Sequence, residues 1–191
     1  MNIINDGNTI LADKAKIIIT KDKVNIISNK AEYDKIKNIV TFTDKVFFND
    51  RENELNIKSD FIKYERNKEL IFSKGKTDLN IEKNYDINSE NIYFDRNLNI
   101  IYSNKETTIK DIENNIFILK GGFEFNIFNK LIKSKKSIIL DKNNNKYIFE
   151  NLFIDLKLNE IVGKELKVEF EKSYFGNKNN DPLLRGRSSY S

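Results

Sequence analysis

Short apolar runs with alternate spacing recur along the chain, separated by polar runs rich in Asp and Asn. Ala31 and Tyr33, and then Val40 and Phe42, occupy alternate positions, a period that points their side chains to one face of a β-strand. Helix is poorly supported, because β-branched and aromatic residues dominate and a three-four spacing is rare. Residues 130–140 fit the strand pattern least well. The pattern predicts an all-β protein.

This pattern repeats with a spacing of 31 and then 30 residues. Ser28, Ser59 and Ser89 each open a segment with an apolar residue three positions later and an aromatic residue five positions later. These aromatic residues are Tyr33, Tyr64 and Phe94. A looser copy lies around 138–141 and a partial early copy at 12–17. A fixed period of this size indicates a stack of equivalent structural units.

The polar runs between the apolar segments predict hairpin turns, since Asp and Asn tolerate left-handed backbone and bond to their own main chain. These runs are residues 34–38, 65–68, 95–99 and 141–145. Asp44-Lys45 and Gly75-Lys76 indicate breaks or bulges where a strand changes direction, and Gly121-Gly122 indicates another tight bend. The hairpins predict about a dozen or more strands of about five or six residues.

Such a chain of hairpins can close as a barrel, form a two-sheet sandwich or coil as a jelly roll with open ends. The period favours stacking, in which each hairpin covers the apolar face of its neighbours. Aromatic residues are then expected in the core. They are Tyr33, Phe42, Tyr64, Phe72, Phe94, Phe117, Phe123, Phe125, Phe149 and Phe153. Alternatively, the inner face is not completely filled and opens to a long apolar ligand.

Charge and composition exclude several functions. Among 191 residues, 33 basic and 29 acidic residues interleave, which is typical of a solvated surface. Nucleic-acid binding is not expected, because the one local basic excess, at 130–136, is short. The chain has no Cys and no His, which removes disulfides, thiolate nucleophiles, imidazole bases and the usual zinc ligands. The longest apolar runs fall far short of the roughly 20 residues of a transmembrane helix.

The acidic residues are mostly at turn positions, where Asp is expected for backbone reasons. The segment 141–145 lacks the Gly and the distal Glu of a calcium loop. No catalytic residue, metal or cofactor is therefore predicted. The first residues also lack the basic start and apolar stretch of a signal peptide.

Several motifs recur with the repeat: Ala12-Asp13-Lys14-Ala15, Ala31-Glu32-Tyr33-Asp34 and Asn38-Ile39-Val40-Thr41-Phe42-Thr43. With them the chain resembles the OstA-like (organic solvent tolerance) domain of the lipopolysaccharide transport family. Asp44-Lys45-Val46 stands where Gly-Asn-Val is usual in that family, whereas Gly75-Lys76-Thr77 keeps the glycine. The segment 175–188 is similar to the junction that precedes the barrel of the outer-membrane lipopolysaccharide-assembly protein, although Leu183 stands where Arg is usual.

This resemblance implies a β jelly roll with an open apolar groove at 1–172, followed by a junction at 173–191 leading to an outer-membrane barrel. It implies a non-catalytic protein that shields the acyl chains of lipopolysaccharide and hands them to the outer-membrane translocon. The implied location is the periplasm or the periplasmic face of the outer membrane. Implied partners are lipopolysaccharide, a periplasmic bridge protein of the same fold docked through edge strands, and, at full length, the barrel with its lipoprotein partner. Neither a leader nor a barrel is in this sequence, so a fragment and a free-standing relative both stay open.

The lipid-facing residues are predicted from one face of the strands, because a shift of one residue exchanges the two faces. They are Ala31, Tyr33, Val40, Phe42, Ile62, Tyr64, Ile71, Ile92, Phe94, Ile101 and Phe149. The alternative function is a structural or adhesive β-solenoid that fills its own core and binds protein partners through its edge strands. A hydrolytic enzyme is a third possibility and requires two converging acids of perturbed pKa.

Overall fold

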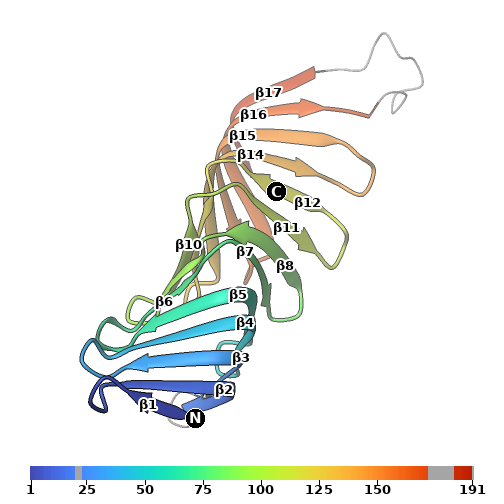
Figure 1. Ribbon diagram of the computed structural model, residues 1–191. Coiled ribbons are helices and arrows are strands. Elements are labelled where there is room, and N and C mark those ends of the chain that lie inside the picture. The colour runs from blue at the N-terminus through green and yellow to red at the C-terminus, as the bar shows by residue number, and fades with distance from the viewer. Residues whose placement is uncertain (20–22, 172–182, 191) are drawn as a thin grey trace. The chain divides into compact units, whose positions relative to one another are not determined.

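The structure, a computed structural model, describes residues 1–19, 23–171 and 183–190 (Figure 1). Its strands are antiparallel and follow one another as stacked hairpins, so the predicted jelly-roll class of all-β fold is confirmed. The chain forms two compact units, Met1–Tyr102 and Ser103–Ser191. None of the helical segments in the described residues is long and apolar enough to cross a membrane.

The first unit is a meander of strands joined by short turns. Its elements are β1 (Asn2–Ile4), β2 (Thr9–Ile19), β3 (Val24–Asp34), β4 (Ile39–Asp50), β5 (Leu55–Glu65), the 3-10 turn η1 (Arg66–Lys68), β6 (Leu70–Ser73), β7 (Lys76–Ile81), β8 (Tyr85–Glu90), β9 (Tyr93–Asp95) and β10 (Ile100–Ser103). Each strand from β1 to β5 pairs with the next. At β5 the ladder divides: β6 pairs with residues 62–65 and continues through β9 to β10, whereas β7 pairs with residues 55–59 and continues to β8.

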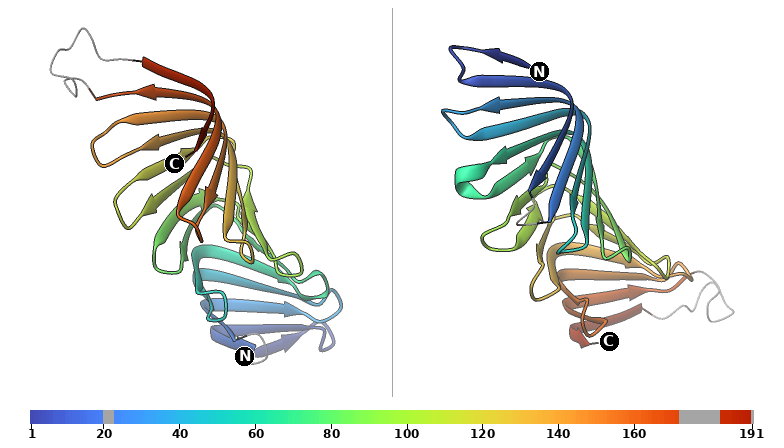
Figure 2. Two further views of the ribbon diagram at one scale, coloured as in Figure 1. Left: turned by 180° about the vertical axis from the view of Figure 1, so that it is seen from behind. Right: turned by 90° about the horizontal axis from the view of Figure 1, so that it is seen from below.

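Strands β2 to β5 are 11 or 12 residues long, about twice the length expected from the sequence. In β4 the ladder continues through the bulge predicted at Asp44-Lys45. Both residues have left-handed backbone, with φ of 64° and 53°, and pairing passes from Thr43 to Val46 with only Asp60 opposite them. The bulge bends β4 without ending its ladder. The right-hand view of Figure 2 shows the bend in the long blue-to-cyan strands of the first unit. At Gly75, with φ of 77°, the break is complete and separates β6 from β7.

The serine that opens each repeat lies beside this bend. Ser28 and Ser59 are buried, and their hydroxyls donate to the carbonyl oxygens of Lys30 at 2.8 Å and of Phe61 at 3.2 Å. A bend interrupts the ladder and leaves backbone groups that must find another partner. The repeated hydroxyl supplies that partner, which explains its period.

The four predicted hairpin turns are confirmed, since each falls between consecutive strands. In the first, Asp34 Oδ1 accepts a hydrogen bond from the backbone N–H of Lys37 at 3.0 Å. The residue before the returning strand is left-handed at Asn38, Glu69 and Asn99. These are the local interactions for which Asp and Asn are favoured in turns.

The inner face of the first unit is apolar and largely filled. Phe42 is completely buried, and Phe48 and Phe94 meet edge to face with ring centroids 6.4 Å apart. The prediction of Phe72 as a core residue is wrong: it directly follows buried Ile71, so it faces the other side of the sheet. There its ring centroid lies 4.7 Å from that of Tyr93, which stacks on Tyr102.

The second unit repeats the hairpin arrangement. Its strands are β11 (Thr107–Asp111), β12 (Ile116–Leu119), β13 (Phe123–Asn126), β14 (Leu131–Leu140), β15 (Lys146–Asp155), β16 (Glu160–Glu169) and β17 (Leu183–Tyr190). They pair in the order β11, β12, β14, β15, β16, β17, and β13 also pairs with β14. Residues 131–140, which belong to the segment that is least strand-like by sequence, thus form β14, which contains a left-handed residue at Lys136.

Three further sequence predictions concern the second unit. The tight bend at Gly121-Gly122 is confirmed: Gly122 has φ of 77° and donates its N–H to the carbonyl of Leu119 at 3.1 Å. Phe153, predicted in the core, is 36% exposed because it lies between the inward residues Leu152 and Ile154. Most of the predicted junction, residues 173–182 and 191, lies outside the described residues.

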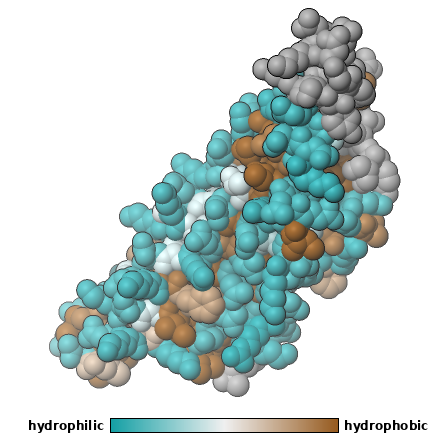
Figure 3. Space-filling model, turned by 90° about the vertical axis from the view of Figure 1, so that its right-hand side faces the viewer, coloured by the Kyte–Doolittle hydropathy of each residue, from teal (hydrophilic) through white to brown (hydrophobic). Residues whose placement is uncertain are grey.

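The surface carries the interleaved charges expected from the sequence. Hydrophilic residues cover most of the face shown in Figure 3, and hydrophobic residues occur among them in separate patches. Ion pairs such as Lys68 with Glu65 and Lys133 with Glu124 join oppositely charged residues on neighbouring turns and strands. The strands are therefore polar on one face and apolar on the other.

Candidate ligand-binding cavity

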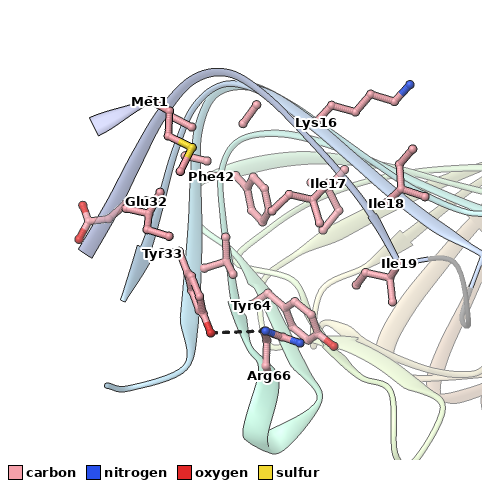
Figure 4. A pocket seen from close by; sticks show the side chains of 16 residues that line it. Met1, Lys16, Ile17, Ile18, Ile19, Glu32, Tyr33, Phe42, Tyr64 and Arg66 are labelled. Atoms are coloured by element: carbon pink, nitrogen blue, oxygen red, sulfur yellow. Dashed lines mark hydrogen bonds between the residues drawn. The ribbon is translucent and has the colours of Figure 1, made fainter. Parts of the chain in front are cut away.

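An apolar cavity of about 640 Å³ opens in the first unit, between the two arms of the bent strands (Figure 4). Its volume lies within the range of about 300–1,000 Å³ typical of small-molecule sites. Strand β2 contributes Ala15, Ile17 and Ile19 to the lining, and Tyr33 and Val40 line the cavity from β3 and β4. The lining is thus mainly aliphatic and aromatic.

Alanine residues explain why space remains here. Ala12 pairs with Ala31, and Ala31 pairs with Phe42. In the next two repeats the position of Ala31 is taken by Ile62 and Ile92, which are at most 1% exposed and fill the core. A methyl group in place of a branched four-carbon side chain leaves volume unfilled at this end of the stack.

Strand β1 covers only part of this end. Residues 2–4 pair with residues 9–11 of β2. Among the described strands, none pairs with residues 12–19 on the side away from β3. Met1, which is 80% exposed, lies at the edge of the cavity. The cavity therefore has an open side beside an uncovered strand edge.

Polar groups form one rim of the cavity at the hairpin turns. The Tyr33 hydroxyl donates to Asn38 Oδ1 at 3.0 Å. The guanidinium of Arg66 donates to the same Tyr33 hydroxyl at 3.5 Å and to Asn38 Oδ1 at 3.4 Å. Its central carbon lies 6.0 Å from the centroid of the Tyr33 ring, at the outer limit of a cation–π contact. An apolar interior thus meets a cationic rim.

Tyr64, in the following repeat, also lines the cavity, and its hydroxyl donates a hydrogen bond to Glu69 Oε2 at 2.7 Å. Burial raises the pKa of Tyr64 to about 12, and the hydrogen bond to Glu69 adds to the effect. Tyr64 is therefore a neutral hydrogen-bond donor at neutral pH.

The structure brings five of the eleven predicted lipid-facing residues together at the cavity. They are Ala31, Tyr33, Val40, Phe42 and Tyr64. Five others, Ile62, Ile71, Ile92, Phe94 and Ile101, point into the same unit but are at most 2% exposed in its packed core. Phe149 belongs to the second unit, where its ring lies against Gly163. Lipid contact by these residues stays a prediction.

Several cavity residues were not predicted from the sequence. Ile10, Ile17, Ile19 and Ile26 are among them. The partial repeat at 12–17 carried the signal for the β2 residues, because its alternation matches that of the later copies. Arg66 had no such signal, since a charge in a turn is most often only solvated.

Carboxylates of the described residues with shifted pKa have structural partners. Burial alone would raise the pKa of Asp141, but hydrogen bonds from the side chain and backbone of Asn145 and the backbone of Asn143 outweigh it and lower that pKa. Hydrogen bonds from Lys63 and Lys68 lower the pKa of Glu65. No group of three or more acidic residues in the described ranges is arranged to hold a metal ion.

No family model matches the chain, and no curated protein matches it. Among solved structures, the chain is similar to LptH of Pseudomonas aeruginosa, described as the LptA homologous periplasmic component of the lipopolysaccharide transport device. The two are 7% identical with a TM-score of 0.32, over 87% of this chain and 95% of that chain.

Proposed function

We propose that this chain is a non-catalytic lipid carrier of lipopolysaccharide transport and outer-membrane assembly, and that its cavity shields acyl chains from water. The main support for this proposal is the cavity of about 640 Å³, which is lined mainly by apolar side chains. An acyl chain that covers this surface gains about 25 cal/mol for each Å² of apolar area removed from water. The OstA-like repeat motifs support lipopolysaccharide as the lipid and the periplasm, or the periplasmic face of the outer membrane, as the location.

Protein partners of the same fold belong to this proposal. The uncovered edge at residues 12–19 of β2 offers backbone N–H and C=O groups to another strand, as in β-augmentation. Strand β17 has a second such edge, since among the described strands it pairs only with β16. A periplasmic bridge protein would dock at one edge, and the lipid would pass along the joined interiors toward an outer-membrane barrel.

A self-filled structural solenoid is the second candidate. It is favoured by the packed interior around Ile62 and Phe94, which needs no ligand. It does not account for the alanine-lined space at the other end of the same unit. The two functions differ in whether that space binds lipid.

Filling the cavity tests the proposal. Ala31→Phe adds a ring on the cavity side of β3, whereas Thr41→Phe adds the same ring on the other face of the sheet. A neutral fluorescent probe, N-phenyl-1-naphthylamine, should bind the wild-type protein and be displaced by lipid A. Ala31→Phe should weaken binding of both, and Thr41→Phe should not. Failure of lipid A to displace the probe, or unchanged binding by Ala31→Phe, would favour the solenoid.

A further inference from the structure

Arg66 and Arg96 occupy equivalent positions in consecutive repeats. Each follows the acidic residue that ends a strand, and the two are 30 residues apart. The backbone N–H of Arg66 donates to the carbonyl of Asn38 at 3.2 Å, and that of Arg96 donates to the carbonyl of Glu69 at 3.0 Å. The backbone N–H of each arginine thus bonds to the left-handed turn residue of the preceding repeat.

Their charges are compensated differently. Arg96 Nη1 lies 2.6 Å from Glu69 Oε2, and its side chain is only 14% exposed. Arg66 instead donates hydrogen bonds to two neutral groups, the Asn38 amide and the Tyr33 hydroxyl. In the repeat of Arg66, Asn38 corresponds to Glu69 and Tyr33 corresponds to Tyr64. Arg66 is also exposed. The replacement of Glu by Asn leaves one guanidinium of the pair without a counter-charge.

Nearby carboxylates do not supply that charge. In the described part of the chain, no carboxylate oxygen lies within ion-pair distance of Arg66. Asp34 pairs with Lys37 at 3.0 Å, and Glu65 pairs with Lys63 at 2.6 Å and Lys68 at 2.8 Å. The two acids that flank this rim are therefore already neutralised by lysines.

Arg66 differs from these lysines because it lines the cavity. Lys16 and Glu32 also line it, but Figure 4 shows their charged ends directed away from the enclosed side chains. The guanidinium of Arg66 instead lies between Tyr33 and Tyr64. An amphiphile with its chain against Ile17 and Phe42 would place its head at this rim.

We infer that Arg66 is the headgroup-binding residue of the cavity and selects amphiphiles whose head carries a phosphate or carboxylate. This inference rests on the proposed function, since it requires an acyl chain in the cavity. A guanidinium donates two parallel hydrogen bonds to such an anion. The Tyr33 hydroxyl and Asn38 amide position the guanidinium without neutralising it.

Two variants test the inference in opposite ways. Arg66→Gln removes the charge. Asn38→Glu keeps Arg66 but gives it the carboxylate that Glu69 gives Arg96, at a left-handed position where Glu69 shows that Glu is accommodated. Lys68→Gln removes a charge from the same turn outside the cavity, and Asn99→Glu adds a carboxylate at the next equivalent turn position. These two are the matched controls.

Binding is measured by displacement of N-phenyl-1-naphthylamine with dodecyl phosphate and with dodecyl maltoside, both below their micellar concentrations. Arg66→Gln and Asn38→Glu should each lower the affinity for dodecyl phosphate about fivefold, which is the effect of losing an exposed ion pair. The affinity for dodecyl maltoside should not change. The controls should bind both as wild type does. Added salt should reduce the wild-type preference for the phosphate.

Other outcomes overturn the inference. One such outcome is that both amphiphiles bind but Arg66→Gln and Asn38→Glu do not change the affinity for dodecyl phosphate. Another is that the two control variants lower this affinity by the same factor. In either case Arg66 does not select the headgroup, and the proposed carrier function stands. If neither amphiphile displaces the probe from the wild-type protein, the proposed function fails together with the inference.

Discussion

Replacing Thr77 by Val removes one hydroxyl from a buried hydrogen-bond cluster at the break between β6 and β7. Thr77 is 1% exposed. Its Oγ1 lies 2.8 Å from the Ser73 hydroxyl and 3.1 Å from the carbonyl oxygen of Gly75. Val keeps the branched shape and fits a strand well, so the change isolates the hydroxyl.

The magnitude follows from what the partners retain. A buried group left unsatisfied costs about 1–3 kcal/mol, whereas a lost net hydrogen bond costs about 0.5–1.5 kcal/mol. The Ser73 hydroxyl still bonds to the backbone of Ile92, and the Gly75 carbonyl still accepts from the N–H of Asn91 at 3.1 Å. The Ser59 hydroxyl, 3.4 Å from Thr77 Oγ1, likewise keeps its hydrogen bond to the carbonyl oxygen of Phe61. None of these partners is orphaned, so Thr77→Val should lower the free energy of unfolding by about 0.5–1.5 kcal/mol.

Urea unfolding followed by circular dichroism measures this difference. Thr41→Val is the control, because Thr41 is only partly buried on the outer face of β4, and its effect should stay within about 0.5 kcal/mol. Equal unfolding midpoints for Thr77→Val and Thr41→Val would refute the view that buried hydroxyls stabilise the strand breaks.

Two further predictions concern turns. Gly122→Ala should destabilise the protein by more than about 3 kcal/mol, because a Cβ there would lie 2.0 Å from the carbonyl oxygen of Ser103. Gly75 has the same φ, but a Cβ there would have no atom within 4 Å. Gly75→Ala should therefore cost only about 1–2 kcal/mol of left-handed backbone strain. Thermal unfolding of the two variants compares them, and equal losses would contradict the close approach. Asp141→Asn should lower stability at pH 7. The folded pKa of Asp141 is lowered, so its contribution is present above the unfolded pKa and is lost as pH falls through the folded pKa; urea unfolding at pH 7 and pH 3 should therefore show a difference from wild type that shrinks in acid, and a constant difference would contradict it.

The sequence predicted the hairpins well because their chemistry is local. Asp34 bonds to the backbone of its own turn, and a left-handed residue such as Asn38 follows from residue type alone. The inward face of β3 and β4 was also predictable, because Ala31 and Tyr33 alternate on one strand and Val40 and Phe42 on the next. These features depend on residues close together in the chain.

Other features depend on the stack as a whole. Phe72 faces outward because its neighbour Ile71 faces inward, and aromatic character alone does not distinguish the two faces. Strand β4 is long because its ladder continues through the bulge at Asp44-Lys45, and a break signal in the sequence does not reveal this. The cavity lies where Ala31 replaces the Ile of later repeats beside an incompletely paired strand, so its position depends on which strands pair with β2.

Photo-crosslinking from the cavity wall is the most direct test of the central claim that this space holds lipid. A benzophenone amino acid replaces Ile17, which lines the cavity, and in a matched protein it replaces Phe72, which lies on the other face. After irradiation with lipid A, the protein labelled at position 17 should form a lipid adduct, and the protein labelled at position 72 should form none. The absence of an adduct at position 17, or equal adducts at both positions, would contradict the account.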